Sequence, residues 1–86
     1  MSRLLIIEDE PALRRALTIN LAARHYEVEA TGTGAAALRA AAANPPDLVI
    51  VDLGLPDLDG LEVIAGLRGW STMPIIVLSA RDSQAQ

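Results

Sequence analysis

The sequence predicts an α/β fold in which a parallel sheet carries helices on both of its faces. The first observation is the order of segments, because short apolar runs alternate with segments of helical periodicity to give βαβαβαβ. The second is that successive apolar runs are joined by single helices, which requires right-handed crossovers between parallel strands. The third is length, since 86 residues suffice for one small domain and not for two.

The first half of the chain contains two predicted strands and two predicted helices. The apolar run 4–7 is rich in branched residues and predicts a strand buried on both faces. Pro11 suits the first turn of a helix, and apolar residues at helical spacing extend that helix to about Arg24. Alternation with period two over 26–30 predicts an edge strand. A turn with a threonine N-cap then introduces an alanine-rich helix over 35–43.

The second half contains the strongest strand signal of the chain. Residues 47–52 follow a Pro-Pro stop and predict a central strand. A loop over 53–59 leads to a third helix over 60–68, and residues 74–78 form the fourth predicted strand. The predicted apolar face of the third helix consists of Leu61, Ile64, Ala65 and Leu67.

Composition removes several classes of protein. The chain has no cysteine and no lysine, so a disulfide scaffold, a thiolate zinc site and a catalytic lysine are excluded. The formal net charge is −4, with 11 acidic residues against 7 arginines, which argues against direct nucleic-acid binding by this chain. No apolar run is long enough to span a membrane and no secretory leader is recognised, so the expected location is cytoplasmic.

Acidic residues follow two of the predicted strands at their carboxyl ends. Glu8 and Asp9 follow the first strand, and Asp52 closes the third. Ligands bind outside the carboxyl ends of strands in open parallel sheets, so these carboxylates would converge if the two strands are neighbours. Their mutual repulsion favours a bound cation, and hard oxygen ligands suit Mg²⁺ or Mn²⁺. The alternative is structural, because Asp9 or Glu10 can cap the helix that opens at Pro11.

Other polar or aromatic residues have structural interpretations as well. Asp47 begins a strand at the opposite end of the sheet and is interpreted as structural. Asp57 and Asp59 are expected to shape a turn or to cap the third helix. Ser79 ends the fourth strand on the side of the acids, where its hydroxyl can hydrogen-bond a phosphoryl oxygen or cap a following helix. Trp70 follows a helix end and is expected to be a packing anchor.

Three motifs together resemble a known family. They are Glu8-Asp9-Glu10, then Asp52-Leu53-Gly54-Leu55-Pro56-Asp57 followed by Asp59-Gly60, and finally Val77-Leu78-Ser79-Ala80-Arg81. In this order and spacing they resemble the receiver domain of bacterial response regulators. The resemblance is strongest to OmpR/PhoB-type transcription regulators, and among these to the KdpE-like regulators. It implies a flavodoxin/CheY-like parallel sheet with strand order 2-1-3-4.

The resemblance also implies a role for each matching residue. Asp52 would be the phosphoacceptor of a two-component system, phosphorylated by a sensor histidine kinase in a Mg²⁺-dependent reaction. Asp52 would also bind the Mg²⁺ ion, together with the carboxylates of Glu8 and Asp9 and the backbone carbonyl of Gly54. Ser79 would be the switch hydroxyl that turns toward the phosphoryl group. Such a module is not an enzyme, beyond self-catalysed phosphotransfer and dephosphorylation.

The chain departs from the family pattern at its end. Residues 1–86 are interpreted as a single receiver domain truncated after the fourth strand, without the family's fifth strand, its lysine or a DNA-binding domain. The fourth strand would then be a bare edge, for which we expect a homodimer or higher oligomer. Two alternatives stay open. One is a binding-only oligomerising module without productive phosphotransfer, and the other is a metal-dependent phosphatase or hydrolase, which lacks a candidate general acid or base.

Overall fold

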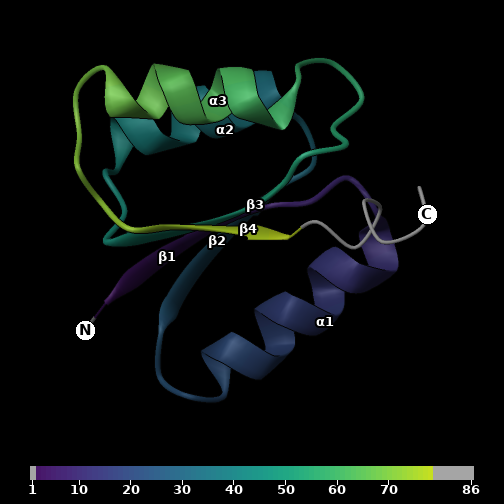
Figure 1. Cartoon of the computed structure of the whole chain (residues 1–86). Helices are drawn as coiled ribbons and strands as arrows, with labels where there is room; N and C mark the ends of the chain where they lie inside the picture. The colour runs from purple at the N-terminus through teal and green to yellow at the C-terminus, as the bar shows by residue number, and fades with distance from the viewer. Residues whose placement is uncertain (1, 79–86) are drawn as a thin grey trace.

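The computed structural model describes residues 2–78, and it confirms the predicted α/β class (Figure 1). Strands and helices alternate throughout this range. The elements are β1 (Arg3–Ile7), α1 (Pro11–Ala22), β2 (Glu27–Thr31), α2 (Gly34–Ala43), β3 (Leu48–Asp52), α3 (Gly60–Arg68) and β4 (Ile75–Leu78). Among residues 2–78, no helix has the length and apolar character that crossing a bilayer requires.

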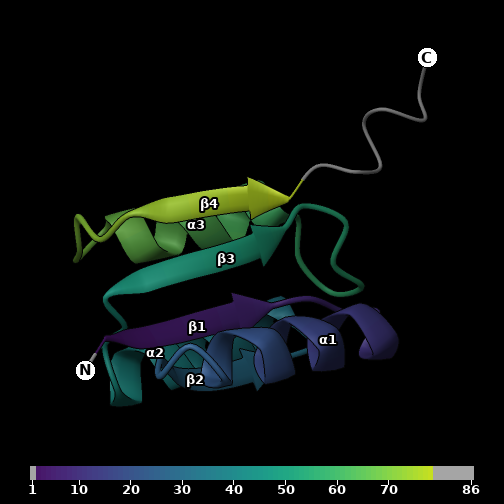
Figure 2. The ribbon, with the colours of Figure 1, turned by 90° about the horizontal axis from the view of Figure 1, so that it is seen from below.

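The four strands form one parallel sheet in the order β2-β1-β3-β4, as the resemblance implied. Figure 2 shows the strand arrows pointing the same way, with β1 and β3 in the middle. In the register, Ile7 pairs with both Thr31 and Val51. The carboxyl ends of β1 and β3 therefore lie level with one another, which brings the residues that follow them to one place.

Helices α2 and α3 cover one face of the sheet, and α1 lies on the other (Figure 1). Alternate residues of the central strands point toward α2 and α3 and build the core with residues of those helices. This core consists of Leu5, Ile7, Ala37, Ala41, Val49, Val51, Val63, Leu67 and Met73. The small alanines of α2 let that helix pack closely on the sheet and on α3.

The face that carries α1 is packed less fully. Within the described residues, α1 has no buried member, although Glu10 caps its first turn by accepting hydrogen bonds from two backbone amides. Helix α1 contacts β2 and β1, and Figure 2 shows it lying along that half of the sheet. Beside it lies a hollow of about 370 Å³, lined largely by Leu4, Leu21, Tyr26, Leu48, Ile50 and Ile76.

Sequence expectations about side-chain burial are wrong for part of α3 and for Trp70. Leu61 and Ala65 were predicted on the apolar face of α3, but Leu61 is 61% exposed and Ala65 is exposed too, because the buried stripe runs through Gly60, Val63 and Leu67 instead. Trp70, predicted to be a packing anchor, is 49% exposed. It lies in the turn after α3, between the buried core residues Leu67 and Met73, and its own side chain remains largely in solvent.

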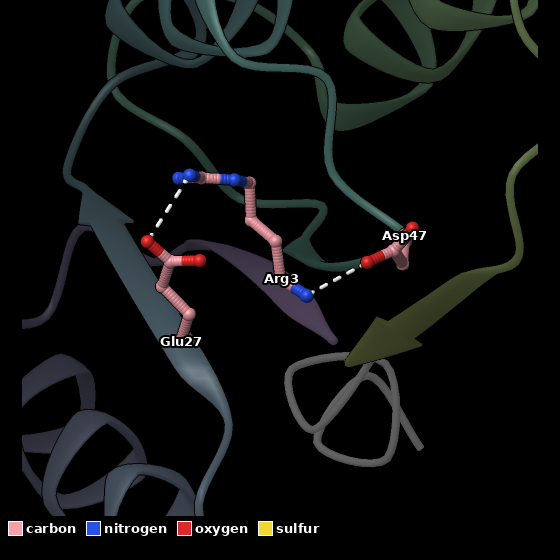
Figure 3. A network of polar contacts seen from close by, with 3 residues as sticks. All are labelled: Arg3, Glu27 and Asp47. Atoms are coloured by element: carbon pink, nitrogen blue, oxygen red, sulfur yellow. Dashed lines mark hydrogen bonds and ion pairs between the residues drawn. The ribbon is translucent and has the colours of Figure 1, made fainter. Parts of the chain in front are cut away.

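The amino end of the sheet is held by a polar network around Arg3 (Figure 3). The Arg3 backbone amide donates to Asp47 Oδ2 over 2.8 Å, and its Nη2 lies 3.1 Å from Glu27 Oε2. Asp47 precedes β3 and Glu27 begins β2, so one residue of β1 ties both neighbouring strands. The structural interpretation of Asp47 agrees with this geometry.

Candidate functional site

The acidic residues predicted to converge do so at the carboxyl end of the sheet. Glu8 and Asp9 follow β1, and Asp52 is the last residue of β3. One carboxylate oxygen from each of the three lies within 4.8 Å of those of the other two. The cause is the register of the two central strands, since Ile7 pairs with Val51 and the next residues of each strand then meet.

Two of these carboxylates are nearly inaccessible to solvent. Glu8 is 2% exposed and Asp52 is 5% exposed, while Asp9 is half-buried. Burial raises the pKa of Glu8 above its ordinary value of 4.5, and the charges of Asp52 and Asp9 raise it further. A hydrogen bond from the Glu10 backbone amide to Glu8 Oε2, 2.9 Å long, acts in the opposite direction on this pKa. Concentrated negative charge in a buried setting is the arrangement that a cation stabilises.

Backbone hydrogen bonds orient the groups around these carboxylates. The Gly54 amide donates to Asp52 Oδ1 over 3.2 Å, which places the start of the β3–α3 loop (residues 53–59) beside the acidic cluster. Arg14 Nη1 donates to the Glu8 backbone carbonyl over 2.9 Å, and this bond steadies the turn between β1 and α1. A Cβ on Gly60 would lie 2.6 Å from Leu53 Cα, so only glycine lets the loop close on itself there.

The two acids of the β3–α3 loop cap two different helices. Asp59 caps α3 through the Leu61 amide, which is one of the two roles predicted for it, and it also forms a capping box with Glu62. Asp57 does not cap α3. Its Oδ1 and Oδ2 accept hydrogen bonds of 2.8 and 2.9 Å from the amides of Gly34 and Ala35 at the start of α2. The loop folds back over α2, and these bonds lower the pKa of Asp57.

The structure thus brings together most of the residues singled out in the sequence. Glu8, Asp9 and Asp52 form one cluster, with Gly54 hydrogen-bonded to it. Ser79 lies outside the described residues, so its role as a switch hydroxyl stays a prediction. The sequence did not predict the role of Arg14. Its partner is the backbone carbonyl of Glu8, and every residue has such a carbonyl, so the residue types give no signal for this contact.

The donor set fits a hard divalent cation. Three carboxylates can each offer one oxygen ligand, and oxygen ligands are those that Mg²⁺ and Mn²⁺ prefer when water and substrate oxygens complete the coordination. The same geometry makes Asp52 a candidate nucleophile, because a cation beside it would offset the charge of an incoming anion.

Comparisons with known proteins show which family the chain resembles. Residues 4–86 match the response regulator receiver domain family. The transcriptional regulatory protein KdpE of Mycobacterium tuberculosis is 62% identical over 81 residues, covering 94% of this chain. The chain spans only 36% of that relative's length.

Solved structures show the same fold. A chain in the crystal structure of histidine kinase ThkA in complex with response regulator TrrA is 36% identical, with a TM-score of 0.86 over 93% of this chain and 70% of that chain. TrrA from Thermotoga maritima in complex with Mg²⁺-BeF is 26% identical, with a TM-score of 0.79 over 99% of this chain and 93% of that chain. By sequence and fold together, the chain belongs to the response regulator receiver domain family.

Proposed function

We propose that this chain is the phosphoacceptor module of a KdpE-like response regulator, with Asp52 as the residue that a sensor histidine kinase phosphorylates. The observation that carries the proposal is the cluster of Glu8, Asp9 and Asp52, whose carboxylate oxygens lie within 4.8 Å of one another at the carboxyl end of the sheet. Such a cluster destabilises the folded chain, because buried like charges repel one another. It favours phosphoryl transfer, because it can bind the cation that this reaction needs.

Glu8, Asp9 and Asp52 would hold Mg²⁺, together with the backbone carbonyl of Gly54. The donor chemistry supports this assignment, and the solved relative TrrA is a complex with Mg²⁺-BeF. When bound, the ion supplies positive charge that offsets both the carboxylates and the incoming phosphoryl group. Mn²⁺ has the same ligand preference and is expected to substitute for Mg²⁺.

The transfer itself is a displacement at phosphorus. A carboxylate oxygen of Asp52 forms a bond to phosphorus while the bond from phosphorus to the imidazole nitrogen of a phosphohistidine breaks. The imidazole leaves with the electron pair of that bond and takes up a proton from solvent. The products are an acyl phosphate on Asp52 and a neutral histidine on the kinase, so atoms and charge balance.

The chain's own residues contribute orientation and protection from water. The Gly54 amide orients the Asp52 carboxylate through Oδ1, and little bulk solvent reaches Asp52, which is 5% exposed. The kinase as partner is supported by the relative TrrA, which is described in complex with the histidine kinase ThkA. Ser79 is proposed to stabilise the phosphoryl group once it is attached.

The test is the intact mass of the chain after incubation with Mg²⁺ and acetyl phosphate. We expect a gain of one phosphoryl group in the parent chain, no gain in Asp52→Asn, and an unchanged gain in Asp47→Asn, a carboxylate variant at the opposite end of the sheet. A folded parent chain without the gain, or a gain that persists in Asp52→Asn, contradicts the proposal.

A second candidate function is an oligomerising module that binds partners without productive phosphotransfer. The observation that favours it is the outer edge of β4, which no strand pairs among residues 2–78. Ile76 and Val77 are 49% and 40% exposed, and β4 carries no charged residue that would oppose pairing with another chain. A second copy of the chain is the proposed occupant of this edge.

Light scattering on the parent chain and on Val77→Lys tests the second candidate. A lysine on the edge strand should lower the measured mass toward that of a monomer, because its charge opposes edge-to-edge pairing. Leu61→Lys is the matched control, since Leu61 is 61% exposed but lies on α3. A parent chain that is monomeric at high concentration, or equal effects of both lysines, contradicts pairing through β4.

A further inference from the structure

The β3–α3 loop is closed at its two ends by bonds that stay within its own neighbourhood. At its start the Gly54 amide donates to Asp52, and at its end the Gly60 amide donates to the Leu53 carbonyl over 3.1 Å. These bonds give the loop its shape. They do not connect the loop to any other layer of the domain.

Leu55 and Leu58 of the loop pack against the hydrophobic core, and Asp57 adds a directional polar connection to α2. Its two carboxylate oxygens each accept one of two successive amides at the start of α2, from Gly34 and Ala35. A Cβ on residue 34 would lie 3.0 Å from Leu58 Cβ, so the absence of a side chain at Gly34 allows the loop to approach. We call this pair of hydrogen bonds the Asp57 clasp.

The clasp holds the loop against a rigid element. Ala37 and Ala41 of α2 are fully buried in the core, and α2 packs on both α3 and β1. A two-point contact with such a helix restrains position and direction together, whereas one hydrogen bond would leave the loop free to pivot. Residues 54–57 are therefore restrained by hydrogen bonds at both ends, to Asp52 and to α2, and by the packing of Leu55 on the core between them.

We infer that Asp57 is a positioning residue for metal binding, because the Asp57 clasp holds the backbone of Gly54 where its carbonyl can act as a ligand. The inference rests on the proposed function, in which Gly54 completes the Mg²⁺ site. Without the clasp, the loop samples more conformations in the metal-free chain, and binding must order it. The metal affinity then falls although no ligand has been removed.

The competing explanation is that Asp57 only stabilises α2 as a helix cap. Under that explanation its removal lowers the free energy of unfolding but leaves the metal affinity of the folded chain unchanged. A simple charge effect is a third possibility, since any lost carboxylate near a cation site weakens attraction. Asp59 offers the control for both, because it is another capping carboxylate of the same loop that caps α3 locally.

The experiment is titration calorimetry of the full chain with Mg²⁺ and with Mn²⁺, at a temperature where every variant is folded. We expect Asp57→Ala to weaken binding about tenfold, the lower end of the range for outer partners of metal ligands. Asp59→Ala should weaken it less than about twofold, although it loses the same charge and a cap. Asp57→Asn should lie between the parent and Asp57→Ala, because its amide retains one acceptor oxygen.

Amide hydrogen exchange gives a second readout that a mere cap would not move. If the loop and the site are coupled, metal binding must also tighten the clasp, since coupling between two sites is reciprocal. Mg²⁺ should then slow exchange at Gly34 and Ala35 in the parent chain but not in Asp57→Ala. Similar metal affinities of Asp57→Ala and Asp59→Ala overturn the inference alone. A parent chain that binds neither ion overturns the metal site itself, and the inference with it.

Discussion

The two ends of the sheet use acidic residues in opposite ways. At the amino end, Asp47 and Glu27 each accept a hydrogen bond from Arg3, at 2.8 and 3.1 Å (Figure 3). At the carboxyl end, Glu8, Asp9 and Asp52 lie within 4.8 Å of one another, and two of them are nearly fully buried. The same residue types thus tie strands together at one end and repel at the other.

The difference separates what folds the domain from what the domain does. Acids that are paired with a cationic side chain or an amide contribute modestly to stability wherever they occur. Acids that are gathered and buried cost stability, and a fold retains them at a site where a ligand relieves the cost. We therefore expect the carboxyl end to be the functional end, with a behaviour that depends on cations and pH far more than that of the amino end.

The largest expected effect is stabilisation by a divalent cation. At a Mg²⁺ concentration one hundred times the dissociation constant, the free energy of unfolding should rise by about 2.7 kcal/mol, because only the folded chain presents the site. Urea unfolding with and without Mg²⁺ measures this rise. Arg3→Met should show the full increase, while Asp52→Asn should show little of it. An equal increase in both variants would place the bound ion elsewhere.

A smaller effect is expected when one buried charge is removed without metal. Glu8→Gln should raise the free energy of unfolding by about 1 kcal/mol, since the amide keeps an acceptor for the Glu10 backbone amide and removes the repulsion from Asp52 and Asp9. Urea unfolding in the presence of a chelator measures it. A loss of stability instead would mean that the Glu8 carboxylate is favourably compensated in the metal-free chain.

The contribution of Glu8 to the free energy of unfolding should also change with pH in a defined direction. The pKa of Glu8 is raised above 4.5 in the folded chain, so the folded state holds this proton more tightly than the unfolded state does. The contribution of Glu8 to stability is therefore greatest below about pH 4.5 and is lost as the pH rises through the folded pKa. Unfolding measured across this range should show that slope in the parent chain and not in Glu8→Gln.

Asp57 should show the opposite pH dependence. Hydrogen bonds from the Ala35 and Gly34 amides lower its pKa below 3.8, so its contribution is present above that value and is lost at more acid pH. The free energy of unfolding should therefore change with pH in two separate ranges, below pH 3.8 because of Asp57 and above pH 4.5 because of Glu8. The Asp57→Asn variant should lose only the change below pH 3.8.

Contacts of the candidate site could be predicted from the sequence where they follow from local patterns and the order of strands, and not where the two residues in contact lie far apart along the chain. The convergence of Glu8, Asp9 and Asp52 followed from strand ends and a parallel sheet, which are local patterns plus one topological rule. The cap at Asp59 was equally local. The two roles expected for Asp57, shaping a turn or capping the third helix, did not include its contact with α2, because its partner Gly34 lies 23 residues away and only the folded path of the loop brings them together.

Burial on α3 was mispredicted for a related reason. Leu61 and Val63 are both apolar, and composition does not say which of them points to the core. The helix is oriented by its start, where Gly60 is buried against Leu53 and the capping box of Asp59 sets the first turn. Val63 and Leu67 then follow Gly60 at helical spacing, which leaves Leu61 in solvent.

The smallest expected effect belongs to the amino end. Arg3→Met keeps an unbranched apolar side chain and removes only the ion pair with Glu27. The side chains of Arg3 and Glu27 are 30% and 53% exposed. Exposed pairs contribute little, so the free energy of unfolding should fall by about 0.5 kcal/mol, and 1 M salt should abolish most of the difference. Arg39→Met, an exposed arginine of α2, serves as the control. A salt-independent loss several times larger would show that the Arg3 side chain anchors β1 through more than its charge. Phosphorylation of Asp52 should be unchanged in Arg3→Met, because Arg3 lies at the opposite end of the sheet from Asp52.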